Sequence, residues 1–165
     1  MMRRSALFRF LSIPFVALWL LGGVCHAENG GRAIAVVVAA DGSWKGMRGG
    51  MSKRLLAQIY RKQVVLDDNG VRLHPVNLPA SHPLRTFFSQ AVFRRSPLDM
   101  AGYWNEQYFQ GISPPHVVAS QEAVMRFVAN TPGAIGYVAA CRVDKRVRVI
   151  YRLKAKKKLA KPLCR

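Results

Sequence analysis

The hydrophobic and polar positions in residues 120–140 predict a helix followed directly by a buried strand. Ser120 suits an N-cap, and apolar residues at helical spacing follow it, namely Ala123, Val124, Phe127 and Val128. Pro132 disfavours helical geometry at the residue before it, and Gly133 permits a positive φ. Residues 134–140 are apolar on both alternating faces, as in a strand covered by helices on both sides. Small residues on one of these faces should allow a helix to pack closely.

The same patterns predict the other elements of the chain. The predicted strands are a central strand of the parallel type at 33–40, a strand at 71–78, a short strand from Val117 and a half-exposed strand at 147–153. Three further helices are predicted: one is capped by Ser52, one begins near Pro83, and one is opened by Ser96. The helix after Ser96 carries Met100, Tyr103, Trp104 and Tyr108 on one side. Aromatic residues at helical spacing predict core packing, and stacking on a sugar is the alternative.

The amino-terminal segment, residues 1–27, is predicted to be a secretory signal peptide. Three arginines precede a short apolar run that Pro14 interrupts, and Cys25-His26-Ala27 places small residues at the positions that determine cleavage. An uncleaved membrane anchor is the alternative, and the large Val24 disfavours lipid modification of Cys25. We therefore expect an exported, periplasmic protein with one lobe at 28–153 and a basic tail at 154–165.

Basic residues strongly outnumber acidic ones, 26 against 8, for a formal net charge of +18. Removal of the predicted signal peptide takes away three arginines and no acid, leaving +15. Such a field attracts polyanions without choosing among them. Export argues against nucleic acid and leaves anionic lipid, lipopolysaccharide or phosphorylated solutes. The tail is either a solvated extension or a docking element for anionic lipid or lipopolysaccharide.

Two cysteines, Cys141 and Cys164, remain after cleavage, in a compartment that permits disulfide bonds. A bond between them would tie the tail to the end of the buried strand. Because spacing alone does not fix geometry, a free Cys141 is an open alternative.

Two stretches are candidate ligand sites. The helix expected over 83–95 has backbone N–H groups at its start which, with Ser81, His82, Arg85 and Thr86, predict a seat for an oxyanion. Asp41-Gly42-Ser43 follows a predicted central strand, at the end where open α/β sheets bind ligands. The glycine-rich continuation of that loop lacks the G-x-x-x-x-G-K-[ST] pattern of a phosphate-binding loop, which favours the alternative of a mobile connection.

The sequence lacks signatures of metal binding and of catalysis. Its histidines are scattered without metal-ligand spacing, and no nucleophile motif or acid–base pair can be assembled. We expect neither a metal nor another cofactor, and no enzyme activity.

Residues 131–138, TPGAIGYV, follow a helix of the pattern S-x-E-x-V-x-x-x-V. This combination resembles the second lobe of phosphate-type periplasmic substrate-binding proteins of ABC transporters (PstS-like proteins), and the likeness extends over about 32–151. The resemblance implies an α/β fold of three layers, with a mainly parallel sheet and helices on both faces. It implies one lobe of a two-lobed clamp.

The resemblance also implies phosphate or a similar oxyanion as ligand, and an ABC permease, a sensor protein or a second lobe as partner. Members carry S-G-T-R followed two residues later by Phe, and Arg85 and Phe87 match the end of that motif. His82-Pro83-Leu84 replaces Ser-Gly-Thr, which removes two hydroxyls and one amide donor. Weak oxyanion binding is one hypothesis. The alternative is a non-catalytic envelope protein whose basic surface binds polyanions or a partner protein.

Overall fold

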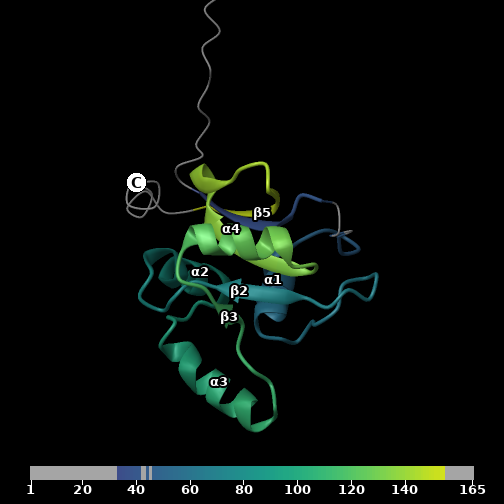
Figure 1. Ribbon diagram of the computed structural model, residues 1–165. Helices are drawn as coiled ribbons and strands as arrows, with labels where there is room; N and C mark the ends of the chain where they lie inside the picture. Colours follow the sequence, from purple (N-terminus) through teal and green to yellow (C-terminus); the bar gives the residue numbers. More distant parts are fainter. Residues whose placement is uncertain (1–32, 42–43, 45, 155–165) are drawn as a thin grey trace, which may run out of the picture.

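The computed structural model describes residues 33–41, 44 and 46–154, so the predicted signal peptide and all of the tail after Lys154 lie outside the described residues. The elements are β1 (Ala33–Ala39), α1 (Lys53–Tyr60), β2 (His74–Asn77), α2 (Pro83–Phe93), α3 (Asp99–Phe109), β3 (His116–Val117), α4 (Gln121–Asn130), β4 (Ala134–Ala139), the 3₁₀ turn η2 (Ala140–Arg142) and β5 (Val147–Lys154). The helices and strands expected from the sequence are all present (Figure 1). No helix in the described ranges is long and apolar enough to cross a membrane.

The five strands form one sheet in the order β3-β2-β4-β1-β5. β2 is parallel to β3 and to β4, whereas β1 is antiparallel to both of its neighbours, β4 and β5. Four strands therefore share one direction, and the predicted mainly parallel α/β class is confirmed. The direction predicted for β1 is wrong, although its central position is correct. Its continuous apolar sequence reports burial on both faces, and burial does not depend on the direction of the neighbouring strands.

Helices cover both faces of the sheet, and β4 lies between them. On one face Gly136 packs against Val124 of α4. On the other face the Tyr137 ring stacks on Phe88 of α2, with 3.9 Å between ring centroids, and lies 6.0 Å from the ring of Tyr60 of α1. Figure 1 shows α4 in front of the sheet, α1 and α2 behind it, and α3 projecting below. The expected three layers are therefore α4, the sheet, and α1 with α2.

Two glycines determine how β4 starts and how it packs. Gly133 has a φ of +73°, and a Cβ at this position would collide with the carbonyl group of Arg72. A Cβ at Gly136 would collide with the side chains of Val124 and Val128. Both positions therefore need glycine, the first for its backbone conformation and the second for close approach of a helix.

Hydrogen bonds at the starts of α1, α3 and α4 follow the sequence prediction. Ser52 and Ser120 each accept a bond of 3.1 Å from the backbone N–H three residues later. Ser96 and Asp99 form a reciprocal capping box, in which the Ser96 N–H donates to Asp99 Oδ2 at 2.9 Å and the Asp99 N–H donates to Ser96 Oγ at 3.1 Å. The bonds from Ser96 hold the pKa of the exposed Asp99 carboxyl below its ordinary value.

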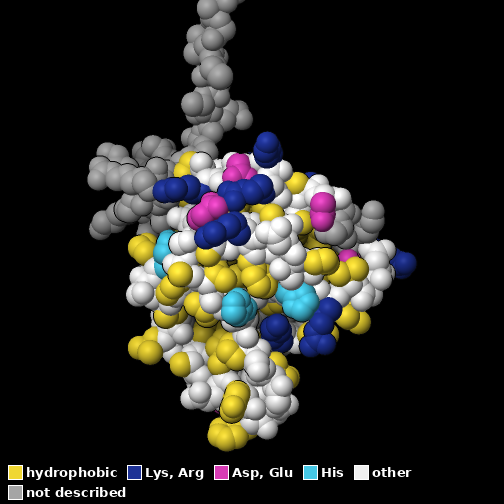
Figure 2. Space-filling model, viewed as in Figure 1, with side chains coloured by type: hydrophobic (Ala, Val, Ile, Leu, Met, Phe, Trp, Pro, Cys, Tyr) yellow, Lys and Arg dark blue, Asp and Glu magenta, His cyan; other side chains and the backbone are white. Residues whose placement is uncertain are grey.

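The packing of α3 differs from the prediction. Met100 is buried and Tyr103 and Trp104 are half-buried, but Tyr108 and Phe109 are 69% and 88% exposed. Apolar side chains consequently show at the lower tip of the molecule, over α3 (Figure 2). Helical spacing indicates which residues share a side of a helix, but not how far the neighbouring elements extend along that side.

Cys141 lies in η2, directly after β4, and forms a disulfide bond. The structure therefore differs from the alternative of a free thiol at this position. Cys164 lies outside the described residues, so its pairing with Cys141 stays a prediction.

We predict that Gly136→Val lowers the free energy of unfolding by about 1–3 kcal/mol or more, because the new side chain must displace Val124 and Val128 from a packed interface. Urea denaturation measures the change. Gly102→Ala in α3 is the control, because its new Cβ meets no atom within 4 Å. We expect that control to stabilise the protein by up to about 1 kcal/mol through helix propensity. Equal stability of Gly136→Val and the wild type would contradict the packing described for β4 and α4.

Candidate functional site

The residues predicted to bind a ligand lie at opposite ends of the strands. Arg85 and Thr86 are in the first turn of α2, which follows the carboxyl end of β2. Asp41 follows β1, whose end lies beside the start of β5. Because β1 is antiparallel to β4, Asp41 lies at the amino ends of β2 and β4, and the first turn of α2 follows the carboxyl end of β2. Asp41 is therefore not part of the predicted oxyanion seat. Gly42 and Ser43 lie outside the described residues, and their contact with a ligand stays a prediction.

The start of α2 offers no free backbone amide for an anion. Pro83 has no N–H, and the Leu84 N–H donates to His82 Nδ1 at 3.1 Å. The N–H groups of Arg85 and Thr86 donate to the His82 carbonyl oxygen at 2.9 and 3.2 Å. The free amides predicted for the seat are therefore absent. The sequence prediction did not include the imidazole of His82 as the N-cap acceptor that takes one of them.

Arg85 is buried in the core instead of pointing to solvent. The residue is 8% exposed, and its Nε and Nη1 atoms are buried without a hydrogen-bond partner. Burial raises the pKa of Tyr60, and it raises the pKa of Tyr137 to about 12, while the charge of Arg85 lowers both. The guanidinium therefore lies close to both tyrosine side chains, between α2 and the sheet.

Four further polar side chains lie in the same part of the core, between α2 and the sheet. The Tyr60 hydroxyl lies 3.1 Å from backbone carbonyl oxygens of both β2 and β4. The Tyr137 hydroxyl donates to Asn77 Oδ1 at 3.3 Å. Ser89, one helical turn after Arg85, is fully buried, and its Oγ has no partner. We call Tyr60, Asn77, Arg85, Ser89 and Tyr137 the Arg85 cluster.

The Arg85 cluster can supply donors to an anion. Arg85 Nε and Nη1 and Ser89 Oγ are three buried groups that make no hydrogen bond within the protein. A buried charge without a partner costs several kcal/mol, whereas an oxyanion supplies both opposite charge and acceptor oxygens. The tyrosine hydroxyls stay protonated at neutral pH, because burial raises the pKa of both. The cluster is therefore positive overall and suits an anionic ligand.

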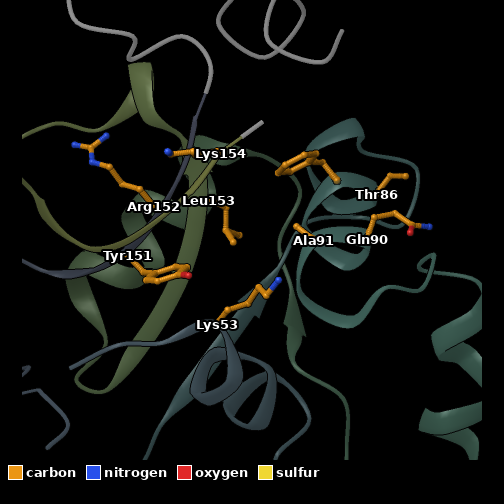
Figure 3. A pocket seen from close by; sticks show the side chains of 9 residues that line it. Lys53, Thr86, Gln90, Ala91, Tyr151, Arg152, Leu153 and Lys154 are labelled. Carbon is orange, nitrogen blue, oxygen red and sulfur yellow. The ribbon is translucent and has the colours of Figure 1, made fainter. Parts of the chain in front are cut away.

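The other predicted seat residues do not converge with Arg85. Ser81 is exposed, and the half-buried His82 uses Nδ1 to cap α2. Thr86 is exposed and lines a separate groove between α1, α2 and β5 (Figure 3). Successive residues of a helix point about 100° apart, so Arg85 and Thr86 face different neighbours.

Sequence reasoning missed Tyr60, Asn77, Ser89 and Tyr137 as members of a polar cluster. Tyr60 and Tyr137 were indistinguishable from ordinary core aromatics, because their hydroxyl partners come from other strands. Arg85 and Ser89 did carry a signal. They are four residues apart on one helix, beside the apolar positions that predict its buried side.

The described part of the chain contains no group of three or more His, Cys, Asp or Glu residues able to hold a metal ion. His74 and His116 start β2 and β3, and His82 precedes α2. These three histidines therefore belong to different elements and do not form one group.

We predict a pH-dependent contribution of His82 to stability. Burial lowers the pKa of His82 from its ordinary 6.5, and Nδ1 must be unprotonated to accept the Leu84 N–H. The unfolded chain then takes up the proton first, so stability is full above about pH 6.5 and falls as the pH decreases through that value. His82→Ser should keep a cap and reduce the loss of stability between about pH 7.5 and 5.5. Urea denaturation at several pH values measures the free energy of unfolding. If its dependence on pH is the same in His82→Ser and in the wild type, the role of His82 is refuted. Burial also lowers the pKa of His74, so part of the slope should remain.

No protein-family model matches the sequence, and no curated protein matches it. Solved structures share the fold at low sequence identity.

They include a putative phosphate ABC transporter substrate-binding protein with bound phosphate from Clostridium perfringens, with a TM-score of 0.54 and 13% identity over 73% of this chain and 45% of that one. An ABC-type phosphate transport receptor from Vibrio cholerae has a TM-score of 0.50 and 20% identity over 73% and 46%. PstS from Borrelia burgdorferi has a TM-score of 0.52 and 14% identity over 76% and 48%. The chain thus spans less than half the length of each, and it has the α/β fold of one lobe of PstS-like binding proteins.

Proposed function

We propose that this chain is a solute-binding-protein-like module that holds phosphate or a similar small oxyanion beside Arg85. The observation that carries the proposal is the buried guanidinium whose Nε and Nη1 have no partner. The planar fork of a guanidinium matches two oxygens of a phosphate or carboxylate. Ser89 Oγ could add a third bond. The fold shared with phosphate-binding proteins supports the same class of ligand.

Binding by this chain alone should be weak. The amides at the start of α2 are occupied, and each hydrogen bond missing from the ligand costs about 0.5–1.5 kcal/mol. Arg85 Nε and Nη1 are closed to solvent, so the first turn of α2 must move before an anion reaches them. A second lobe, a permease or a sensor protein would supply the opposite wall.

The predicted signal peptide and the shared fold support the proposal that this module works in the periplasm, in ABC-type uptake or in sensing. No catalytic step is part of the proposal. Holding the solute requires charge and hydrogen-bond donors, which the Arg85 cluster supplies without a nucleophile.

We predict that Arg85→Met stabilises the ligand-free protein by about 1 kcal/mol or more, because it removes an unpaired buried charge and keeps most of the apolar volume. The same change should abolish stabilisation by phosphate. Thermal unfolding with and without phosphate or sulfate measures both effects. Arg54→Met, at an exposed position of α1, removes the same charge and is the control. A destabilised Arg85→Met protein, together with a wild type that does not respond to either anion, would contradict the proposal.

A separate observation favours polyanion binding as a second candidate function. Lys62, in the turn after α1, is close to Arg72 and His74 at the start of β2. Burial lowers the pKa of Lys62 and Arg72 lowers it further, and burial together with Lys62 and Arg72 lowers the pKa of His74. None of these three residues forms an ion pair with a described carboxylate. An uncompensated basic patch of this kind attracts anionic surfaces.

For this second function we predict salt-sensitive binding to phosphatidylglycerol vesicles that tightens as the pH falls from about 7.5 to 5.5, because His74 then gains its proton. His74→Gln should remove the pH dependence, and Arg72→Gln should weaken binding at every pH. Lys145→Gln, in an exposed turn before β5, is the control. Co-sedimentation measures the bound fraction. Binding that is independent of Arg72 and lost on deletion of residues 154–165 would place the polyanion site in the tail.

A further inference from the structure

A hollow lies between α1, α2 and β5, on a side of α2 that Arg85 does not line. Its volume is about 750 Å³, within the roughly 300–1,000 Å³ typical of small-molecule pockets. Lys53 reaches it from the start of α1, Gln90 and Ala91 from α2, and Tyr151 and Leu153 from β5. Figure 3 shows Tyr151 and Leu153 projecting from β5 toward α2 across this space. We call it the β5 groove.

The walls of the β5 groove are largely apolar. Phe87 and Leu153 are buried, and Ala91 and Tyr151 are half-buried. Residues on one strand alternate between its two faces, so Arg152 points away from the groove while its neighbours face it (Figure 3). An apolar wall on each side leaves room for an apolar group between β5 and α2.

The polar groups of the β5 groove are donors without an acidic partner. Lys53 extends its ammonium group into the space (Figure 3). Thr86 and Gln90 of α2 are also among the lining residues. None of the residues that line the groove is acidic. Lys53 forms no ion pair with a carboxylate of the described chain. A cation beside apolar walls is complementary to a molecule that joins an anionic group to an apolar body.

We propose that the β5 groove binds an anionic amphiphile, a single acyl chain that ends in one carboxylate or phosphate group. The chain lies between Tyr151 and Leu153 on one side and Phe87 and Ala91 on the other. The anionic end pairs with the Lys53 ammonium group. A free tetrahedral oxyanion would leave most of the volume empty and the apolar walls in water, so this site selects a different ligand from the Arg85 cluster.

Calorimetric titration of the purified protein tests the proposal with probes held below their critical micelle concentrations. Dodecanoate and dodecyl phosphate distinguish the two anionic ends, and dodecyl maltoside is the uncharged control. We expect one site per chain for at least one anionic probe, and binding of the maltoside at least roughly tenfold weaker. Absence of binding by both anionic probes would overturn the proposal.

Variants separate the groove from non-specific adsorption. Lys53→Gln should weaken binding of the anionic probe roughly tenfold or more, since a charge-assisted bond is lost. Ala91→Phe should fill the groove and abolish binding, and Gln90→Trp, at an exposed position, does the same if Ala91→Phe fails to fold. Lys145→Gln, in the exposed turn before β5, changes the charge equally at a residue that does not line the groove, and should leave the affinity unchanged. Equal affinity in the wild type, Lys53→Gln and a filled variant would overturn the proposal.

Arg85→Met distinguishes this inference from the proposed oxyanion function. The variant should keep its affinity for the anionic amphiphile, because Arg85 does not line the groove. Loss of amphiphile binding in Arg85→Met, with Lys53→Gln unaffected, would assign the probe to the Arg85 cluster and overturn the groove site.

Discussion

The close contact between Gly136 of β4 and Val124 of α4 sets the spacing on which the other layers depend. A side chain at Gly136 would push α4 away from the sheet, because Val124 and Val128 already fill the space above it. The opposite face of β4 carries Tyr137, whose ring stacks on Phe88 and so fixes the position of α2. One strand, small on one face and aromatic on the other, therefore joins both helical layers.

The same stacking brings a charged side chain into the core. Arg85 is one turn before Phe88 and Ser89, so the helix face that packs on Tyr137 also carries the guanidinium beneath the sheet. The hydrogen bonds of the two tyrosine hydroxyls go mainly to the backbone and to Asn77, and Arg85 Nε and Nη1 receive no partner. A fold that tolerates such an uncompensated charge gives up stability, which is typical of positions kept for binding.

α2 separates two sites of different chemistry. The oxyanion site proposed at the Arg85 cluster is buried and rich in hydrogen-bond donors. The β5 groove is larger and mostly apolar, with Lys53 as the cation that extends into it. Because both proposed sites border α2, any molecule that packs against this helix would affect access to both.

The sequence by itself determined the elements, the serine caps of α1, α3 and α4, the need for glycine at 133 and 136, and the α/β class. These follow from local backbone preferences and from hydrophobic spacing. It did not determine the direction of β1, since burial looks the same in parallel and antiparallel pairs. It therefore could not show that Asp41 and the first turn of α2 lie at opposite ends of the strands. Only the tertiary structure decided that His82 occupies an α2 amide, that Arg85 turns inward and that Thr86 faces β5. Those outcomes depend on partners from distant segments, and a pattern of neighbouring residues carries no information about such partners.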